Sequence, residues 1–159
     1  MMLKDAIRKL VTKVQQTTGE QLKAASAKEL KRAEQAGLPA DLIEFYRECD
    51  SDVCIELKQR IWSIDNALVE NQGAVPGCYL FPHGFIVFAS NLGGDSYCID
   101  TNVTTDEGYH PVVLFSHEMI EEDTPVAKIQ SLRLEVASSL QDFLVKFANE
   151  ELLDEPLYG

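Results

Sequence analysis

Cys98, His110 and His117 are the residues of this chain whose types could do nucleophilic chemistry. Such chemistry needs a base within hydrogen-bond reach of the nucleophile and a further group that orients the base. The sequence supplies these residue types and nearby carboxylates, but no spacing forces them together. A small Cys- and His-dependent hydrolase or metal enzyme is therefore one hypothesis for this chain, to be weighed against a binding protein.

Two short patterns could begin a metal site, and each lacks a necessary part. His117 and Glu121 would share one face of a helix, but no second histidine is near and Pro125 follows closely. The series that opens at Asp100 resembles a calcium loop, but Thr105 stands where that loop needs glycine. We therefore predict no metal and no cofactor.

The strongest turn signal, Asn91-Leu92-Gly93-Gly94, can be interpreted as a phosphate cradle or as a hairpin turn. Phosphate cradles normally open onto a helix N-terminus, whereas a strand-like segment follows here and Asp95 would repel the phosphate. We therefore predict a hairpin in which Gly93 or Gly94 supplies φ > 0. Gly93, Gly94 and Asp95 are then structural turn residues, and Asp95 and Asp100 are strand-end residues whose default role is solvation.

The turn must be held by the segments on either side of it. Residues 85–88 read Phe-Ile-Val-Phe, a run too short for a helix, which predicts a strand buried on both faces. Full burial of four such side chains would supply roughly 6–12 kcal/mol. Residues 96–100 predict the second strand of the hairpin, and residues 111–115 predict a third.

Apolar periodicity and capping signals predict the other elements. We expect helices at residues 2–16, from about residue 20 with a break near Ser26 and a capped run over 27–36, from Pro39 to about Asp50, from Ser63 or Asp65 to about Asn71, and after Ser138 or Ser139. We expect short strands at residues 53–57 and 61–63. Residues 126–136 do not decide between helix and strand.

The negative charge is concentrated in the C-terminal part of the chain. Residues 1–60 carry 11 Lys and Arg against 10 Asp and Glu, whereas residues 61–159 carry 3 against 16. This distribution argues against direct nucleic-acid binding, which needs cationic side chains. It favours a basic protein partner and would speed its association roughly 10–10³-fold at low salt; the alternative is that it serves solubility alone. The predicted partner-binding residues are Asp106, Glu107, Glu118, Glu121, Glu122 and Asp123.

Length and composition predict one ordinary domain with its own core, since the chain has 159 residues and is 45% hydrophobic. No apolar run approaches the ~20 residues of a membrane span, and the N-terminal segment is too charged for a signal peptide. We expect a cytoplasmic protein with no membrane partner. Its four cysteines should be free thiols, with a Cys49–Cys54 disulfide as the alternative.

We divide the chain into an N-terminal helical extension at residues 1–25, a single α+β domain at residues 26–150, and an acidic C-terminal tail at residues 151–159 that we expect to be loose. The helix of the extension is amphipathic, and no aromatic residue would anchor it on a membrane. It should pack on the domain or on a second subunit, so a homodimer remains open.

Residues 26–150 also carry a series of motifs in a defined order. They are Leu38-Pro39-Ala-Asp-Leu42 with Phe45-Tyr46-Arg47, then residues 84–95 with Tyr97 and Ile99-Asp100, then Pro111-Val-Val, and finally Ala137-Ser-Ser-Leu140 with Asp142-Phe143-Leu144. In this order they resemble the SUKH superfamily, which includes fungal cell-wall regulators and many bacterial immunity proteins. Asp50-Ser51-Asp52 departs from the pattern, because many relatives have Asn-Gly there.

The resemblance implies an α+β fold with a central, mostly antiparallel sheet and helices packed around it. It supplies no shared catalytic residues, and in bacteria it implies binding and blocking a cognate toxin, frequently a nuclease. The leading hypothesis is therefore a non-enzymatic immunity protein that binds a basic toxin domain through its acidic surface. The enzyme described above and a regulatory scaffold are the alternatives.

Overall fold

The Phe-Ile-Val-Phe run lies in β3 (Phe85–Ser90), which pairs antiparallel with β4 (Ser96–Asp100), as the sequence predicted. Every side chain of both strands is buried. The turn between them has Gly94 at φ 92°, so the predicted left-handed glycine is confirmed at this position. These observations come from a computed structural model that describes residues 1–156.

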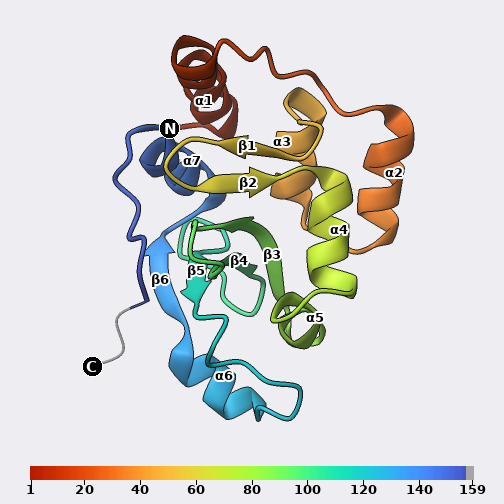
Figure 1. Cartoon of the computed structure of the whole chain (residues 1–159), viewed down its shortest axis with the longest axis vertical. Helices are drawn as coiled ribbons and strands as arrows, with labels where there is room; N and C mark the ends of the chain where they lie inside the picture. Colours follow the sequence, from red (N-terminus) through yellow and green to blue (C-terminus); the bar gives the residue numbers. More distant parts are fainter. Residues whose placement is uncertain (157–159) are drawn as a thin grey trace.

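The hairpin is the centre of one six-stranded sheet. Its order is β1-β2-β3-β4-β5-β6, and each strand runs antiparallel to its neighbour (Figure 1). The other strands are β1 (Cys54–Glu56), β2 (Arg60–Trp62), β5 (Val112–Phe115) and β6 (Leu134–Ala137). The predicted α+β class with a mostly antiparallel sheet is thus confirmed.

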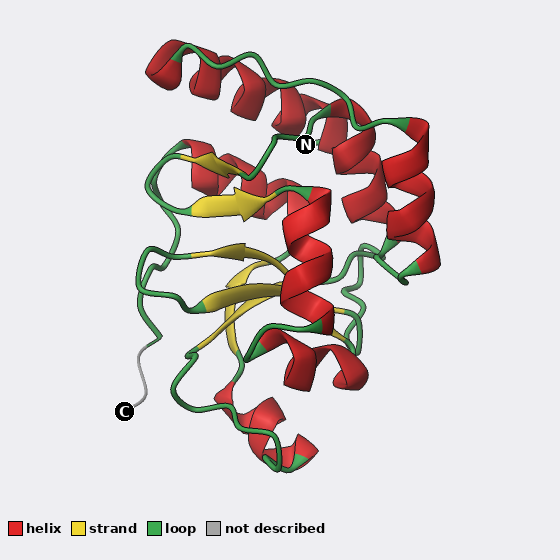
Figure 2. Cartoon of the chain, turned by 45° about the vertical axis from the view of Figure 1, so that its right-hand side comes forward, coloured by secondary structure: helices red, strands yellow, loops and turns green. Residues whose placement is uncertain are grey.

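Helices enclose this sheet, and most of them lie along the top and right of the view in Figure 2. Ser26, Ser63 and Ser139 each accept a hydrogen bond from a backbone N–H of the helix that follows, which explains why those helices begin there. The helices are α1 (Leu3–Thr18), α2 (Ala27–Gln35), α3 (Ala40–Glu48), α4 (Ile64–Gln72), α5 (Gly77–Leu80), the 3₁₀ turn η1 (Phe81–His83), α6 (Val126–Leu132) and α7 (Leu140–Ala148).

The two faces of the sheet pack into two hydrophobic cores. Side chains of β4 alternate between the two cores: Tyr97 and Ile99 belong to the larger core, and Cys98 belongs to the smaller. The larger core includes α3 and α7, with Phe143 edge-on to both Phe88 and Tyr97. The buried face of α1 joins this same core, so the N-terminal helix packs on the domain.

The structure corrects two expectations and decides one segment that the sequence left open. Residues 20–25 are not helical, and Lys23 instead forms an isolated bridge with Asp50. Residues 126–136 contain both α6 and most of β6. The alternating pattern of β6 covers only four residues, which is too few to indicate a strand from the sequence. Asp100 is not solvated: it is 1% exposed and pairs with Arg133, with 2.9 Å between its Oδ2 and Nε.

The C-terminal tail is held more firmly than expected. Leu152 is buried in the larger core, the Tyr97 hydroxyl donates to the Leu153 carbonyl at 2.8 Å, and the Asn91 amide donates to the Asp154 carbonyl at 2.6 Å. The first part of the predicted tail therefore covers the hairpin. Residues 157–159 lie outside the described residues.

Asn71 gives a first test of this packing. β2 pairs only with the end of β3, at Ala89 and Ser90. Nearer the start of β3, the Asn71 side-chain amide takes the hydrogen bonds that a neighbouring strand would otherwise make. It accepts from Val87 N and donates to Val87 O, each at 2.8 Å.

We expect Asn71→Leu to lower the free energy of unfolding by about 2–3 kcal/mol, because it leaves buried backbone groups of Val87 unpaired. Urea unfolding would measure the change, and Gln72→Leu, at the exposed neighbouring position, is the control. Equal stability of the two variants would contradict this account of the β3 edge.

Candidate functional site

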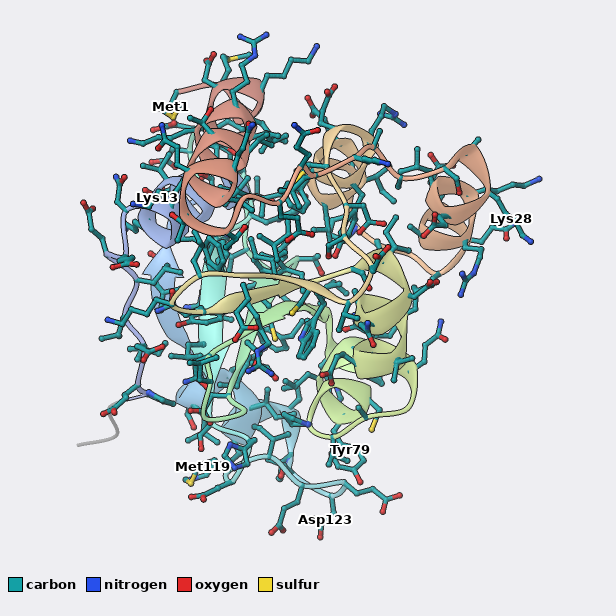
Figure 3. The ribbon with its side chains drawn as sticks, turned by 45° about the horizontal axis from the view of Figure 1, so that its top comes forward. Met1, Lys13, Lys28, Tyr79, Met119 and Asp123 are labelled. Atoms are coloured by element: carbon teal, nitrogen blue, oxygen red, sulfur yellow. The ribbon has the colours of Figure 1, made fainter. Side chains whose placement is uncertain are left out.

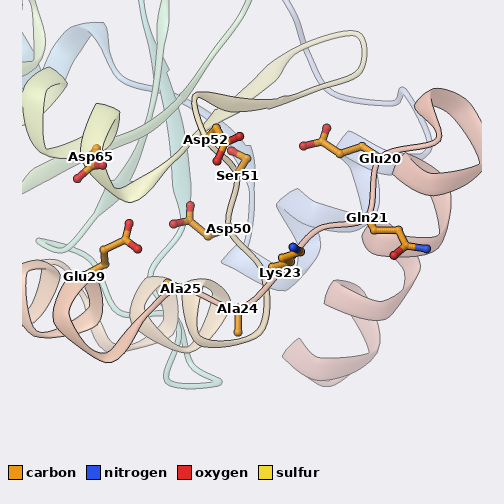
Figure 4. Close-up of a pocket in the computed structure, with 10 residues that line it drawn as sticks. All are labelled: Glu20, Gln21, Lys23, Ala24, Ala25, Glu29, Asp50, Ser51, Asp52 and Asp65. Carbon is orange, nitrogen blue, oxygen red and sulfur yellow. The ribbon is translucent and has the colours of Figure 1, made fainter.

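A polar pocket of about 580 Å³ lies between the linker that joins α1 to α2 and the segment that follows α3 (Figure 4). We call it the acidic pocket, because five of its ten lining residues are carboxylates and only one is a lysine. The lining residues are Glu20, Gln21, Lys23, Ala24, Ala25, Glu29, Asp50, Ser51, Asp52 and Asp65.

Backbone hydrogen bonds join the two walls of the pocket. Asp50 N donates to Lys23 O at 2.7 Å, and Ala25 N donates to Tyr46 O at 3.0 Å. The linker is therefore attached as a short extended segment beside the end of α3. Tyr46 is itself fixed, because its hydroxyl donates to Trp62 O at 2.7 Å. Asp50 consequently lies on a segment that hydrogen bonds attach to the linker.

Asp50 is the most deeply buried carboxylate of the pocket. It is 9% exposed, and its Oδ1 accepts one hydrogen bond from Ile64 N, at the start of α4, at 3.3 Å. Burial raises the pKa of Asp50 to about 6, and the nearby charges of Glu29 and Asp65 add to the effect. Figure 4 shows its carboxylate facing the space between these two side chains. No ion pair joins Asp50 to any of residues 1–156.

The other carboxylates are only partly neutralised. Asp65 pairs with Arg32 at 2.6 Å, and the Ser26 hydroxyl donates to Glu29 at 3.0 Å. Beside them, the Ser51 hydroxyl oxygen is shielded from solvent and has no hydrogen-bond partner among the described residues. Such an arrangement repels phosphate and suits the ammonium or guanidinium group of a basic side chain.

The acidic residues predicted to bind a partner do not form one surface. Asp106 and Glu107 lie in the loop from β4 to β5, whereas Glu118, Glu121, Glu122 and Asp123 follow β5. Because Ser96 pairs with Phe115 and Ile99 with Val112, these two loops leave the sheet at opposite ends.

The loop of Glu118 to Asp123 is exposed, as expected, apart from Ile120, which anchors it in the smaller core. Figure 3 shows Asp123 at the bottom of the view and Lys28, the neighbour of Glu29, well apart from it at the right. The acidic pocket and this loop are therefore separate surfaces.

The turn residues are structural in their contacts. Asp95 Oδ1 accepts from His117 N at 3.0 Å and lies 2.8 Å from His117 Nδ1. Burial acts to raise the pKa of Asp95, but the hydrogen bonds from Asn91 and His117 outweigh it and hold the pKa below its usual value. Asp95 thus ties the hairpin turn to the segment after β5, and the default expectation of solvation is wrong for it.

The residues of the enzyme hypothesis are not assembled into a catalytic group. Cys98 is fully buried, and burial raises the pKa of its thiol well above the usual value, so it stays protonated. His110 Nδ1 lies 2.7 Å from Val103 O, while His117 is engaged with Asp95. Within residues 1–156, no three His, Cys, Asp or Glu side chains are grouped to hold a metal ion.

All four cysteines are free, which excludes the Cys49–Cys54 disulfide in this structure.

The acidic pocket was missed by sequence reasoning. Its five carboxylates lie between residues 20 and 65, mostly in the part of the chain whose charges nearly cancel. Asp50-Ser51-Asp52 was interpreted only as a helix end, although its departure from the family pattern was a signal.

The model of the SMI1 / KNR4 family (SUKH-1) matches residues 23–146. The search of curated proteins gives no match. None of the helices within residues 1–156 has the length and apolar character needed to cross a bilayer.

Proposed function

Because the chain belongs to the SMI1 / KNR4 family (SUKH-1), whose domains are known in immunity proteins and cell-wall regulators, we propose that it is an immunity protein that binds and neutralises a toxin. The family is generally non-enzymatic. In this proposal the chain acts in the cytoplasm by occupying the toxin rather than by chemistry.

The observation that carries the proposal is the uncompensated charge of the acidic pocket. Asp50, Glu29 and Asp65 face one space, and only Asp65 has a cationic partner, Arg32. A toxin domain with clustered Lys and Arg side chains would supply the missing counter-charges. If that toxin is a nuclease, the same basic side chains would bind the phosphates of its substrate. Carboxylates that pair with them would therefore prevent the nucleic acid from binding.

Salt dependence tests the electrostatic part of the proposal. The partner would be the toxin encoded in the neighbouring reading frame, and surface plasmon resonance would measure association with the full chain. We expect the association rate to fall at least tenfold between 50 mM and 500 mM salt, because screening weakens charge steering. Absence of binding, or an association rate independent of salt, would count against it.

Charge-neutral variants locate the surface that binds the toxin. Glu29→Gln with Asp65→Asn neutralises two carboxylates of the acidic pocket, whereas Glu121→Gln with Glu122→Gln removes the same charge from the exposed loop. We expect the pocket variant to weaken binding more strongly than the loop variant. The reverse order would move the docking site to the loop, which holds four of the six partner-binding residues that the sequence predicted.

A further inference from the structure

A second hollow lies where α1 begins, beside the loop from β4 to β5 and the first turn of α7. It consists of two adjoining pockets of about 570 and 500 Å³, which share Met2, Asp5, Tyr109 and Gln141. We call it the N-terminal groove. Its α1 wall lies outside residues 23–146, the part that matches the family, so the groove combines the family domain with an additional helix.

Gln141 is a buried polar side chain without a partner. It is 8% exposed and lines both pockets, and none of residues 1–156 hydrogen-bonds its side-chain amide. Its amide atoms are open to the groove rather than sealed in the interior, so a bound ligand can hydrogen-bond them in place of water. Its carbonyl accepts and its NH₂ donates, which matches the N–H and C=O groups of a peptide backbone.

The rest of the groove combines apolar surface with negative charge. Met1 and Met2 are 72% and 70% exposed, and Tyr109 is 36% exposed. Exposed apolar side chains gathered at one place mark interaction sites, and methionine adapts to irregular partners. Around them are five carboxylates, of which Asp5 pairs with Arg8 and Asp142 with Lys146. Within residues 1–156, Asp41, Glu44 and Glu107 have no ion-pair partner.

We propose that the N-terminal groove binds a peptide segment of a protein partner that carries an apolar side chain next to Lys or Arg. The apolar side chain packs on Met2 and Tyr109, the peptide backbone pairs with the Gln141 amide, and the basic side chain meets the carboxylates of the rim. This site is separate from the acidic pocket and does not depend on toxin binding there.

The test uses the folded full-length chain and an array of immobilised random octapeptides. We expect the retained peptides to be enriched in Leu, Met or Phe beside Lys or Arg. Gln141→Leu should weaken binding of a retained peptide at least tenfold without lowering stability, because it removes only an unpaired amide. Tyr109→Ala, in the loop, should weaken it similarly. The controls are Gln130→Leu, at an exposed position of α6, and Asp50→Asn, in the acidic pocket. Both should bind the peptide normally.

The proposal would be overturned if both groove variants bound as well as the controls, or if the retained peptides lacked this composition. It would also be overturned by sedimentation data showing a dimer that Met2→Asp dissociates, because a second copy of the chain would then cover the groove. Asp50→Asn separates this test from the proposed function. The proposed function expects this variant to lose toxin affinity, whereas the groove proposal expects it to bind the peptide normally.

Discussion

Replacing Arg133 by Met is expected to lower the free energy of unfolding by about 3–5 kcal/mol at neutral pH, the typical cost of breaking a buried ion pair. Asp100 is 1% exposed, and Arg133 is the cation that faces it, at 2.9 Å. Without the guanidinium, Asp100 keeps only its hydrogen bonds from Asn102. A charged carboxylate would then remain in the interior without a counter-charge.

A matched control is available in the same chain. Arg32 and Asp65 are closer, at 2.6 Å, but their side chains are 49% and 58% exposed. Exposed pairs contribute about 0–1 kcal/mol, so Arg32→Met should change stability little. Chemical denaturation of both variants, and of Asp100→Asn with Arg133→Met, measures the difference. Losses of the same size for Arg32 and Arg133 would show that burial does not control the strength of the Asp100 pair.

This pair also marks the limit of prediction from sequence. The strand at residues 85–88 and the helix start at Ser26 were predicted correctly, and Ser63 and Ser139 were each one of two predicted caps, because these signals lie within a few neighbouring residues. Asp100 and Arg133 are brought together by β5 and β6, and no local pattern reports such a contact. An acid at a strand end was therefore assigned to solvent.

The acidic pocket was hidden for the same reason. Glu20, Glu29, Asp50 and Asp65 come from four segments, and the Lys23–Asp50 bridge brings two of them side by side. Charge summed along the chain averages these acids against the lysines of α1 and α2, none of which lines the pocket. The sum instead drew attention to residues 61–127, which contain no Lys or Arg. Six of the ten acids in that stretch lie on two loops at opposite ends of the sheet.

Asp50→Asn is expected to make the protein more stable and weaker in binding. The pKa of Asp50 is about 6 in the folded chain, above the ordinary value of about 3.9. The folded state therefore holds its proton more tightly, so stability falls as pH rises from about 4 to about 6 and stays lower above that range. Asparagine carries no charge and can still accept from Ile64 N, so it avoids a penalty of up to about 3 kcal/mol at pH 8.

Thermal unfolding at pH 8 and at pH 4 tests this, because the advantage of Asp50→Asn should be present at the higher pH and nearly vanish at the lower. Toxin affinity should fall at least tenfold in the same variant, because the deepest negative charge of the pocket is gone. A purely structural Asp50 would leave affinity unchanged, and a variant less stable than the wild type at pH 8 would show that its charge holds the fold. A gain in stability with a loss of affinity is the combination expected of a carboxylate whose counter-charge comes from the partner.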